Sequence, residues 1–218
     1  MSLRLVIAVR GGPEAKSRLA ATLSSESRAA LIEAMLADML AAAAVCRVVQ
    51  RTYVVTPTPA LARLAAEAGA VVILEREPRG LNAAFETARQ RLADLDPAGP
   101  IALLPGDLPR LHPADLEDAA TRAADDTVVI VRSQSDGGTG AIVQPAGLAL
   151  PLTFGRDSFC RHCGAAAGLG LAVSSPALAS LSLDVDRGID LHRLTASANA
   201  GRAAALARAL TLPAGAAA

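Results

Sequence analysis

Three aspartates in this chain have the residue type and spacing expected of metal ligands. Asp107 lies in IALLPGDLPRL (101–111), directly after four apolar residues, and Val185 separates Asp184 from Asp186. Alternate residues of a strand point to the same face, so we expect the last two carboxylates to lie together. Like charges repel unless a positive group lies between them, and hard cations such as Mg²⁺ prefer oxygen ligands. The aspartates therefore predict a metal site; the alternatives are a turn aspartate at 107 and a solvated strand edge at 184–186.

A glycine-rich turn carries the basic residues that could bind an anion. Gly11, Gly12, Lys16 and Arg18 occur within GGPEAKSRL (11–19). This stretch matches neither the dinucleotide fingerprint nor the Walker P-loop. A glycine turn with two cations can still bind a triphosphate through backbone N–H groups and charge-assisted hydrogen bonds. The alternative is an ordinary solvated loop. Together with the three aspartates, the turn predicts a metal–nucleotide site.

The cysteines and histidines do not predict a metal site or a nucleophile. Cys160 and Cys163 flank Arg161 and His162, but no second pair of this kind occurs to complete a tetrahedral zinc site. We interpret both cysteines as small packing residues. Three cysteines are too few for a disulfide framework. His112, before a proline, and His192, in a helical stretch, are typical of capping or surface residues.

The composition indicates one globular domain without a polyanionic or membrane partner. Hydrophobic residues make up 52% and charged residues 19% of the 218 positions. Lys plus Arg and Asp plus Glu both number 21, so no overall charge attracts nucleic acid or an anionic membrane. The apolar start (3–9) is bracketed by arginines and is typical of a first strand rather than a signal peptide. We expect a single domain over 1–218, located in the cytoplasm.

Alternating strands and helices must position these residues. Short β-branched runs alternate with longer alanine- and leucine-rich segments, which predicts an α/β fold with a mostly parallel sheet. The expected strands are 3–9, 51–56, 70–74, 101–104, 127–133, 139–145 and 182–186. The expected helices are 24–45, 60–69, 80–95, 112–124, one beginning at 187 or 188, and one near the C-terminus. The core spans about 3–194, followed by a C-terminal helix and frayed tail at about 198–218. The apolar face of that helix packs on its own sheet or on a second subunit in a homodimer.

Four polar clusters follow strands of this expected sheet. Ligands of open parallel sheets bind beyond the carboxyl ends of the strands. The clusters are GGPEAKSRL, EREPRGLNAA (75–84), PGDLPRL (105–111) and DVDRGIDL (184–191). We therefore expect them to meet at one edge and to form the site.

Six ordered motifs resemble a known family. They are AKSRLA (15–20), RGLNAA (79–84), LLPGDLPRL (103–111), DGGTGA (136–141), FGRDSFCRH (154–162) and LDVDRGIDL (183–191). This pattern, over about residues 3–194, is similar to the guanylyltransferases of the CofC/FbiD type. These act in the biosynthesis of the deazaflavin coenzyme F-420. Their superfamily comprises nucleotidyltransferases with a Rossmann-like, three-layer αβα fold, including the molybdopterin guanylyltransferases.

The resemblance implies a reaction and a role for each matched residue. GTP and a small phosphorylated carboxylic acid (2-phospho-L-lactate, phosphoenolpyruvate or 3-phospho-D-glycerate) would give a guanylylated diphosphate and pyrophosphate. Asp107, Asp184 and Asp186 would hold two magnesium ions, and Lys16 and Arg18 would face the triphosphate. The other implied nucleotide contacts are Gly11, Gly12, Gly80, Leu81, Asn82 and Gly106. The implied acceptor contacts are Thr139, Gly140, Gly155 and Ser158. Catalysis would depend on Lys16, Arg18 and Asp107.

Two positions depart from the family pattern, and two other functions stay open. Gly140 stands where the family often has a side chain able to bind the acceptor, and Arg10 stands where lysine is common. The acceptor is therefore the least defined part of the resemblance. One alternative is a molybdopterin or sugar-phosphate nucleotidyltransferase of the same fold. The other is a non-catalytic nucleotide-binding homologue.

Overall fold

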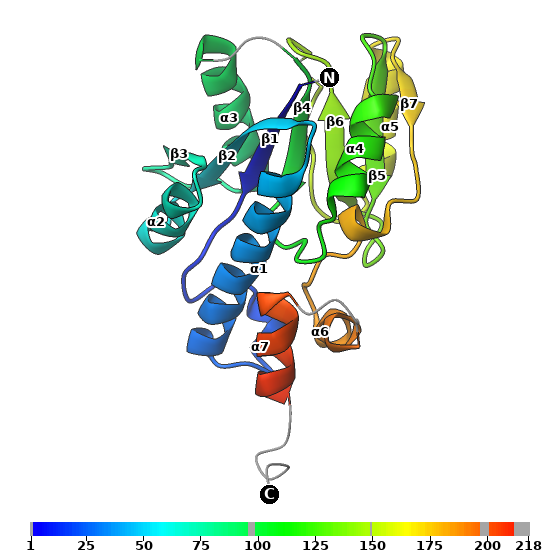
Figure 1. Cartoon of the computed structure of the whole chain (residues 1–218). Helices are drawn as coiled ribbons and strands as arrows, with labels where there is room; N and C mark the ends of the chain where they lie inside the picture. Colours follow the sequence, from blue (N-terminus) through cyan, green and yellow to red (C-terminus); the bar gives the residue numbers. More distant parts are fainter. Residues whose placement is uncertain (1, 96–98, 149, 197–200, 212–218) are drawn as a thin grey trace, which may run out of the picture.

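A seven-stranded sheet forms the centre of the molecule (Figure 1). The computed structural model describes residues 2–95, 99–148, 150–196 and 201–211. The strand order is β3-β2-β1-β4-β6-β5-β7. The strands are β1 (Leu3–Ala8), β2 (Val49–Thr56), β3 (Val71–Leu74), β4 (Ile101–Pro105), β5 (Thr127–Arg132), β6 (Thr139–Gln144) and β7 (Ala172–Ser174). The expected α/β class and mixed, mostly parallel sheet are confirmed: β6 pairs antiparallel with β4 and β5, and the other neighbours are parallel.

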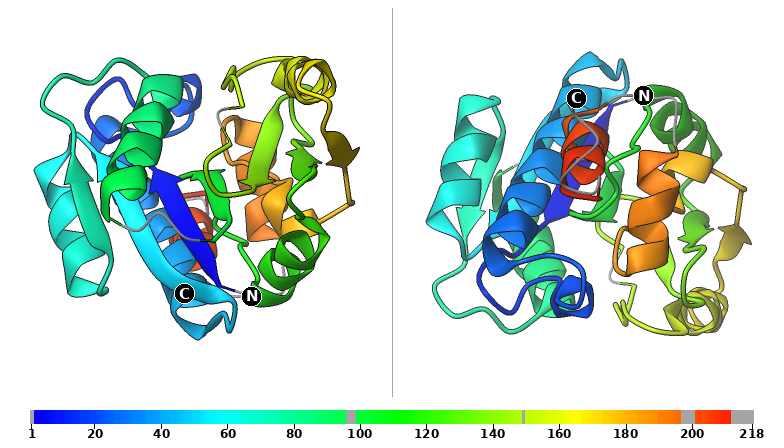
Figure 2. Two further views of the ribbon diagram at one scale, coloured as in Figure 1. Left: turned by 90° about the horizontal axis from the view of Figure 1, so that it is seen from above. Right: turned by 90° about the horizontal axis from the view of Figure 1, so that it is seen from below.

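Helices cover both faces of this sheet and complete three layers. The helices are α1 (Ser25–Val45), α2 (Pro59–Glu67), α3 (Leu81–Leu95), α4 (Pro113–Arg122), α5 (Ser158–Gly168), α6 (Gly188–Thr195) and α7 (Arg202–Thr211). One apolar cluster joins alternate strand residues to α1, α2 and α4, and a second joins the opposite face to α3 and α5. Figure 2 shows α3 and α5 on one side of the strands and α1 and α4 on the other. Strands β1 and β4 are buried on both faces, which explains their continuous apolar sequences.

Helix α1 begins and packs as its sequence predicts. Ser24 is the N-cap, and its side chain accepts a hydrogen bond from the backbone N–H of Ser27 at 3.1 Å. Leu31, Met35 and Met39 recur at helical spacing and are fully buried against the sheet.

The C-terminal helix α7 packs on its own chain. The Asp38 carboxylate of α1 accepts the backbone N–H groups of Arg202 and Ala203, at 2.8 and 2.9 Å, where α7 begins. Ala203 and Ala207 are buried in the cluster that contains α1. Figure 1 shows α7 beside α1 and α6, so this apolar face is used within the chain, on helices rather than on the sheet.

The expected strand at 182–186 is wrong. Residues 183–186 form an extended loop that follows a short 3-10 helix, η2 (Ala179–Leu181). Backbone hydrogen bonds tie this segment to two other loops. Ser182 O, just before the loop, accepts from Gln134 N at 2.8 Å, and Val185 N donates to Asp107 O at 3.1 Å. No neighbouring strand edge is available to this loop among the described residues, so the alternating sequence does not form a ladder.

Two elements were not predicted, and one expectation lies partly outside the described residues. Helix α5 and the short edge strand β7 lie between the expected strands 139–145 and 182–186, where no element was expected. Helix α7 confirms the expected C-terminal helix, whereas the frayed tail after Thr211 lies outside the described residues.

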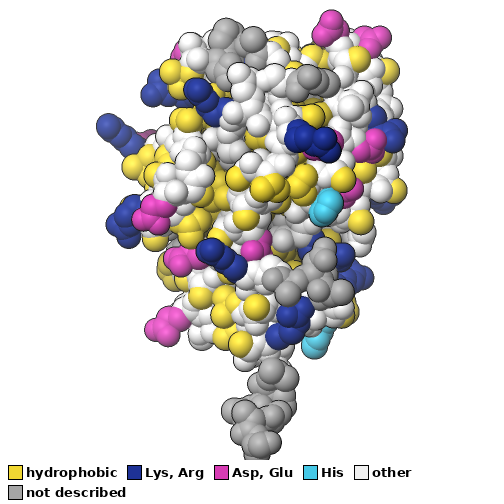
Figure 3. Space-filling view, in the orientation of Figure 1, with side chains coloured by type: hydrophobic (Ala, Val, Ile, Leu, Met, Phe, Trp, Pro, Cys, Tyr) yellow, Lys and Arg dark blue, Asp and Glu magenta, His cyan; other side chains and the backbone are white. Residues whose placement is uncertain are grey.

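The surface carries mixed charge. On the face shown in Figure 3, basic and acidic side chains are interspersed with apolar atoms. This distribution agrees with the equal numbers of basic and acidic residues. No helix in the described part of the chain is long and apolar enough to cross a membrane.

Candidate active site

The four polar clusters meet at the carboxyl ends of the central strands, as expected. They line a cavity of about 240 Å³, which we call the Lys16 cavity. The charged residues and glycines on its wall are Arg10, Glu14, Lys16, Glu75, Gly80, Gly106, Asp107 and Asp186. A second cavity of about 200 Å³, the Thr139 cavity, is lined by Thr139, Gly140, Gly155, Asp184 and others. Leu81, Pro105, Asp107 and Asp186 line both cavities, so the two meet at these residues.

Lys16 joins two of the three candidate metal ligands. Its Nζ lies 2.5 Å from Asp107 Oδ2 and 3.1 Å from Asp186 Oδ1. Burial alone would lower the pKa of Lys16, but the two carboxylates outweigh that effect and raise its pKa above the ordinary value. Arg18 also pairs with Asp186, at 2.5 Å. Lys16 therefore supplies positive charge between the carboxylates of Asp107 and Asp186.

The two aspartates beside Lys16 differ in their electrostatic environment. Burial raises the pKa of Asp107; Lys16 opposes this rise, and the nearby Asp184 and Asp186 add to it. Burial would also raise the pKa of Asp186, but Lys16 and Arg18 lower it below the ordinary value. Asp107 Oδ1 is buried and has no hydrogen-bond partner among the residues that the structure describes. A buried carboxylate oxygen without a partner is costly, so this atom is suited to bind a cation.

Asp184 is held by hydroxyl groups instead of by a lysine. Ser133 Oγ donates to Asp184 Oδ1 at 2.6 Å, and Ser135 Oγ lies 2.9 Å from both carboxylate oxygens. Neither serine was predicted from the sequence, because both come from the segment after β5, about 50 positions before their partner. The loop places Asp184 and Asp186 on the wall of the Thr139 cavity even though it is not a strand.

The three aspartates do not enclose an ion by themselves. Among the described residues, no three His, Cys, Asp or Glu side chains are grouped closely enough to bind one metal ion. The donor set nevertheless fits magnesium, because it consists of carboxylate oxygens and includes the unpartnered Asp107 Oδ1. The oxygens of a bound triphosphate would complete the coordination shell.

Tight turns position Lys16 and Asp107. Lys16 has a left-handed backbone (φ 53°) directly before the 3-10 helix η1 (Ser17–Leu19). Arg28 of α1 donates to three carbonyls of this loop, Pro13 O, Ala15 O and Leu23 O, at 2.7, 3.2 and 3.0 Å. Gly106 lets β4 turn against β1, because a Cβ there would lie 2.5 Å from the Val9 Cβ.

Several candidate nucleotide residues lie as expected and others do not. Gly80, Leu81 and Gly106 line the Lys16 cavity. Gly11 and Gly12 do not line it, and Gly11 N donates to Thr58 Oγ1 at 3.0 Å. Asn82 does not line this cavity either. Its side chain binds the backbone of Phe154: Oδ1 accepts from Phe154 N at 2.7 Å, and Nδ2 donates to Phe154 O at 3.2 Å. Asn82 therefore fixes the 154–158 loop to α3.

The candidate acceptor residues gather around the Thr139 cavity. Thr139, Gly140 and Gly155 line it, whereas Ser158 lies fully buried behind and donates to Thr139 Oγ1 at 3.1 Å. The departure at Gly140 has a steric reason, because a Cβ would lie 1.9 Å from Leu181 O of η2. Only glycine fits where η2 packs on β6.

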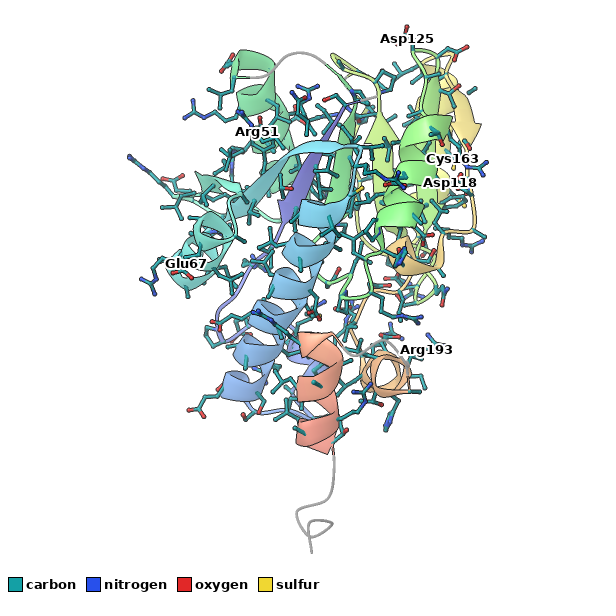
Figure 4. The ribbon with its side chains drawn as sticks, viewed as in Figure 1. Arg51, Glu67, Asp118, Asp125, Cys163 and Arg193 are labelled. Carbon is teal, nitrogen blue, oxygen red and sulfur yellow. The ribbon has the colours of Figure 1, made fainter. Side chains whose placement is uncertain are left out.

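The cysteines and histidines do not line either of the two cavities. Cys163 is partly buried against the core, but Cys160 is exposed, so the packing interpretation is wrong for Cys160. Figure 4 shows Cys163 on the side of the molecule that contains α5, opposite Glu67 of α2. His112 caps α4, and its Nδ1 accepts from Ala114 N at 3.3 Å.

Known proteins are similar to this chain over most of its length. Residues 3–213 match the family model described as "Guanylyl transferase CofC like". A 3-phospho-D-glycerate guanylyltransferase of Phenylobacterium zucineum is 47% identical over 184 residues, which cover 84% of each chain. A phosphoenolpyruvate guanylyltransferase of Rubrobacter xylanophilus is 37% identical and covers 90% of this chain and 95% of its own. Among solved structures, a nucleotidyl transferase from Methanothermobacter thermautotroptrophicus superposes with a TM-score of 0.69 at 19% identity, covering 88% and 95% of the two chains. The last similarity supports the nucleotidyltransferase fold.

Proposed function

The chain belongs to the CofC-like guanylyl transferase family, and we propose that it transfers GMP from GTP to a small phosphorylated three-carbon acid in a magnesium-dependent reaction. The Lys16 cavity would bind GTP and the Thr139 cavity would bind the acceptor. The observation that carries this proposal is that the two cavities meet at Asp107 and Asp186. A transfer between two bound anions needs both of them beside one set of charged groups.

The chemistry requires charge compensation more than a strong base. An acceptor phosphate oxygen attacks the α-phosphorus of GTP, a new P–O bond forms, and the bond to the bridging oxygen of the departing pyrophosphate breaks. The second pKa of a phosphate monoester is about 6, so the nucleophile is already anionic at neutral pH. Lys16 and Arg18 would reduce the repulsion between the two anions and stabilise the leaving pyrophosphate. These roles explain why the site contains lysine, arginine and aspartate.

Magnesium would be held by Asp107, Asp184 and Asp186. When bound, it would withdraw charge from the phosphate oxygens and align them for displacement. Ser133 and Ser135 orient Asp184 for this task. Lys16 keeps Asp186 and the second oxygen of Asp107 in place, which leaves Asp107 Oδ1 available.

The Lys16 cavity contains groups that suit a guanine base. Gly80 and Leu81 lie on its wall beside the apolar Ala84, and two carboxylates, Glu14 and Glu75, also line it. Guanine presents N–H donors at its N1 and N2 positions, and a carboxylate accepts such bonds. These groups would favour GTP over CTP and UTP.

Among the three acceptors, 3-phospho-D-glycerate is the one that we favour. The 47% identical relative is named for this substrate, whereas a more distant relative is named for phosphoenolpyruvate. By its family resemblance, the product would serve the biosynthesis of the deazaflavin coenzyme F-420.

The test is pyrophosphate release, measured with purified protein, Mg²⁺, GTP and each of 3-phospho-D-glycerate, phosphoenolpyruvate and 2-phospho-L-lactate. We expect release that requires GTP and one of these acceptors. Release with CTP or UTP in preference to GTP would contradict the nucleotide assignment. Binding of GTP without pyrophosphate release in any mixture would identify a non-catalytic homologue.

A further inference from the structure

His162 is a fully buried polar side chain that takes no direct part in the proposed transfer. It lies in α5 and has no exposed surface. Its ring stacks edge-on against Phe154, with 5.0 Å between the ring centroids. Both ring nitrogens have hydrogen-bond partners: Nε2 lies 2.9 Å from Thr153 N, and Nδ1 lies 2.8 Å from Thr139 Oγ1. The imidazole therefore connects the backbone at 153 to a wall of the Thr139 cavity.

The backbone partner determines which tautomer His162 adopts. A backbone N–H can only donate, so the Nε2 that faces Thr153 must carry a lone pair. In a neutral imidazole the proton is then on Nδ1, and Nδ1–H donates to Thr139 Oγ1. Burial, with a smaller contribution from the Arg161 charge, lowers the pKa of His162 to about 4, so the ring is neutral at physiological pH.

This tautomer determines the direction of the Thr139 hydroxyl. Thr139 Oγ1 accepts one hydrogen bond from His162 Nδ1–H and a second from Ser158 Oγ at 3.1 Å. Both lone pairs of the oxygen are thereby occupied. Among the described residues the Thr139 O–H has no acceptor of its own, and Thr139 lines the cavity. Its proton is left to donate to a ligand.

We propose that His162 is a positioning residue, which fixes the Thr139 hydroxyl as a hydrogen-bond donor to the phosphate of the bound acceptor. This inference deepens the proposed function and depends on acceptor binding in the Thr139 cavity. An anionic phosphate oxygen has no hydrogen to donate, so a hydroxyl held as a donor favours it over a ligand that donates. A charge-assisted bond of this kind is stronger than one between neutral groups.

Two substitutions of His162 each remove one of the two hydrogen bonds of the imidazole and can keep the other. In His162→Asn the amide nitrogen can replace Nδ1 and donate to Thr139, while the acceptor for Thr153 is lost. In His162→Gln the amide oxygen can replace Nε2 and accept from Thr153, while the donor to Thr139 is lost. Both variants remove the ring that packs on Phe154, so they are matched for the loss of packing.

The readout is the KM for each substrate, measured with the acceptor that is active in the wild-type protein. We expect His162→Gln to raise the acceptor KM about tenfold, the usual effect of losing one hydrogen bond to a charged group. His162→Asn should stay within about threefold of wild type, and the KM for GTP should change little in both. In a Thr139→Val background, His162→Gln should add no further increase, because the hydroxyl that it orients is already gone.

A purely structural role would give a different pattern. Equal acceptor KM values in the Asn and Gln variants, or additive effects of His162→Gln and Thr139→Val, would overturn the inference. If the wild-type protein releases no pyrophosphate with any acceptor, the proposed function itself fails, which is a separate outcome.

A measurement on the wild-type protein keeps the inference testable if the variants do not fold. The chain has three histidines, so ¹⁵N-labelled histidine spectra resolve each ring. We expect one ring to be in the Nδ1–H tautomer and to stay neutral below pH 6. Finding no Nδ1–H tautomer among the three rings would contradict the proposed direction of the Thr139 hydroxyl.

Discussion

Single residues determine the chemistry of the site, and Asp107 is the most informative of them. It lines both cavities, pairs with Lys16, and has one buried oxygen without a hydrogen-bond partner in the described part of the chain. Its side chain therefore combines an electrostatic cost in the free protein with a proposed role in binding the metal.

Replacing Asp107 with Asn should separate activity from stability. We expect the turnover number to fall at least about 100-fold, because a charged ligand of the reacting phosphates is lost. The urea midpoint without ligands should stay equal or rise, since burial disfavours this carboxylate and Lys16 keeps its pair with Asp186.

The matched control is Asp118→Asn. Asp118 is on α4, where Figure 4 labels it, and it pairs with Arg122 at 2.9 Å. That change should leave turnover unaltered. Near wild-type turnover in Asp107→Asn would remove Asp107 from the catalytic residues.

The buried imidazole of His162 predicts a pH dependence of stability. Its pKa is about 4 in the folded protein, below the ordinary histidine value of 6.5, so the unfolded chain binds the proton first as the pH falls. The stabilisation is complete above pH 6.5 and decreases as the pH falls toward 4. Between pH 7.5 and 5 this group alone should reduce the free energy of unfolding by about 2 kcal/mol.

Urea titrations at the two pH values measure this loss. His162→Gln should lose about 2 kcal/mol less than wild type between them, because glutamine does not titrate. The same loss in wild type and variant would show that His162 does not bind a proton on unfolding.

At the scale of elements, loops beyond the strand ends bring the reactive groups together. Arg28 on α1 donates to three carbonyls of the loop that carries Lys16. This helix therefore positions the main cation of the site as well as packing on the sheet.

Arg28→Lys should weaken nucleotide binding. Lysine keeps the charge but offers one nitrogen where the guanidinium serves three carbonyls. With the Lys16 loop less restrained, we expect the KM for GTP to rise about tenfold and the acceptor KM to change less. Arg47→Lys is the control, since the Arg47 side chain is 90% exposed and pairs with Glu117 on the surface. An unchanged KM for GTP in Arg28→Lys would contradict this role.

Much of the element order could be predicted from the sequence. The apolar run at 101–104 predicted a buried strand, and the helical spacing of apolar residues after Ser24 predicted a helix. Both elements are confirmed, as β4 and α1. The loop at 183–186 was misassigned because its alternating sequence resembles a strand, while strand formation depends on a partner edge elsewhere. Helix α5 buries Ser158, His162 and Ala166, a face of polar and small side chains rather than large apolar ones, so its sequence gave little indication of a helix.

Site residues that belong to a sequence motif could be predicted. Those whose role depends on a contact with a distant segment could not. Lys16, Asp107 and Asp186 lie together as expected. Three residues outside the motifs were missed because their roles depend on contacts with other segments: Ser133, Ser135 and Arg28. His162 lies in a motif, but its role depends on its contacts with Thr139 and Thr153. Asn82 illustrates the converse: its place in a motif suggested the nucleotide, but its side chain binds the backbone of Phe154.

For the molecule as a whole, we propose that the chain is one cooperative domain. A single sheet separates the two apolar clusters, and helices cover both. A homodimer stays a prediction, and the buried alanines of α7 are already covered by α1 and α6.

Cooperative unfolding can be checked with two probes. The chain has no tryptophan and one tyrosine, Tyr53, which is fully buried in β2. We expect its fluorescence and the far-UV circular dichroism to change in one coincident urea transition. Two separate midpoints would indicate two folding units.

The central claim is that the two cavities join GTP to a phosphorylated three-carbon acid. The most direct measurement is pyrophosphate release from GTP with 3-phospho-D-glycerate, phosphoenolpyruvate or 2-phospho-L-lactate, with Mg²⁺ and after its removal by a chelator. The account predicts release with at least one acceptor that stops without Mg²⁺ and falls at least about 100-fold in Asp107→Asn. No release with any of the three acceptors, at high enzyme concentration and in Mg²⁺, would contradict it.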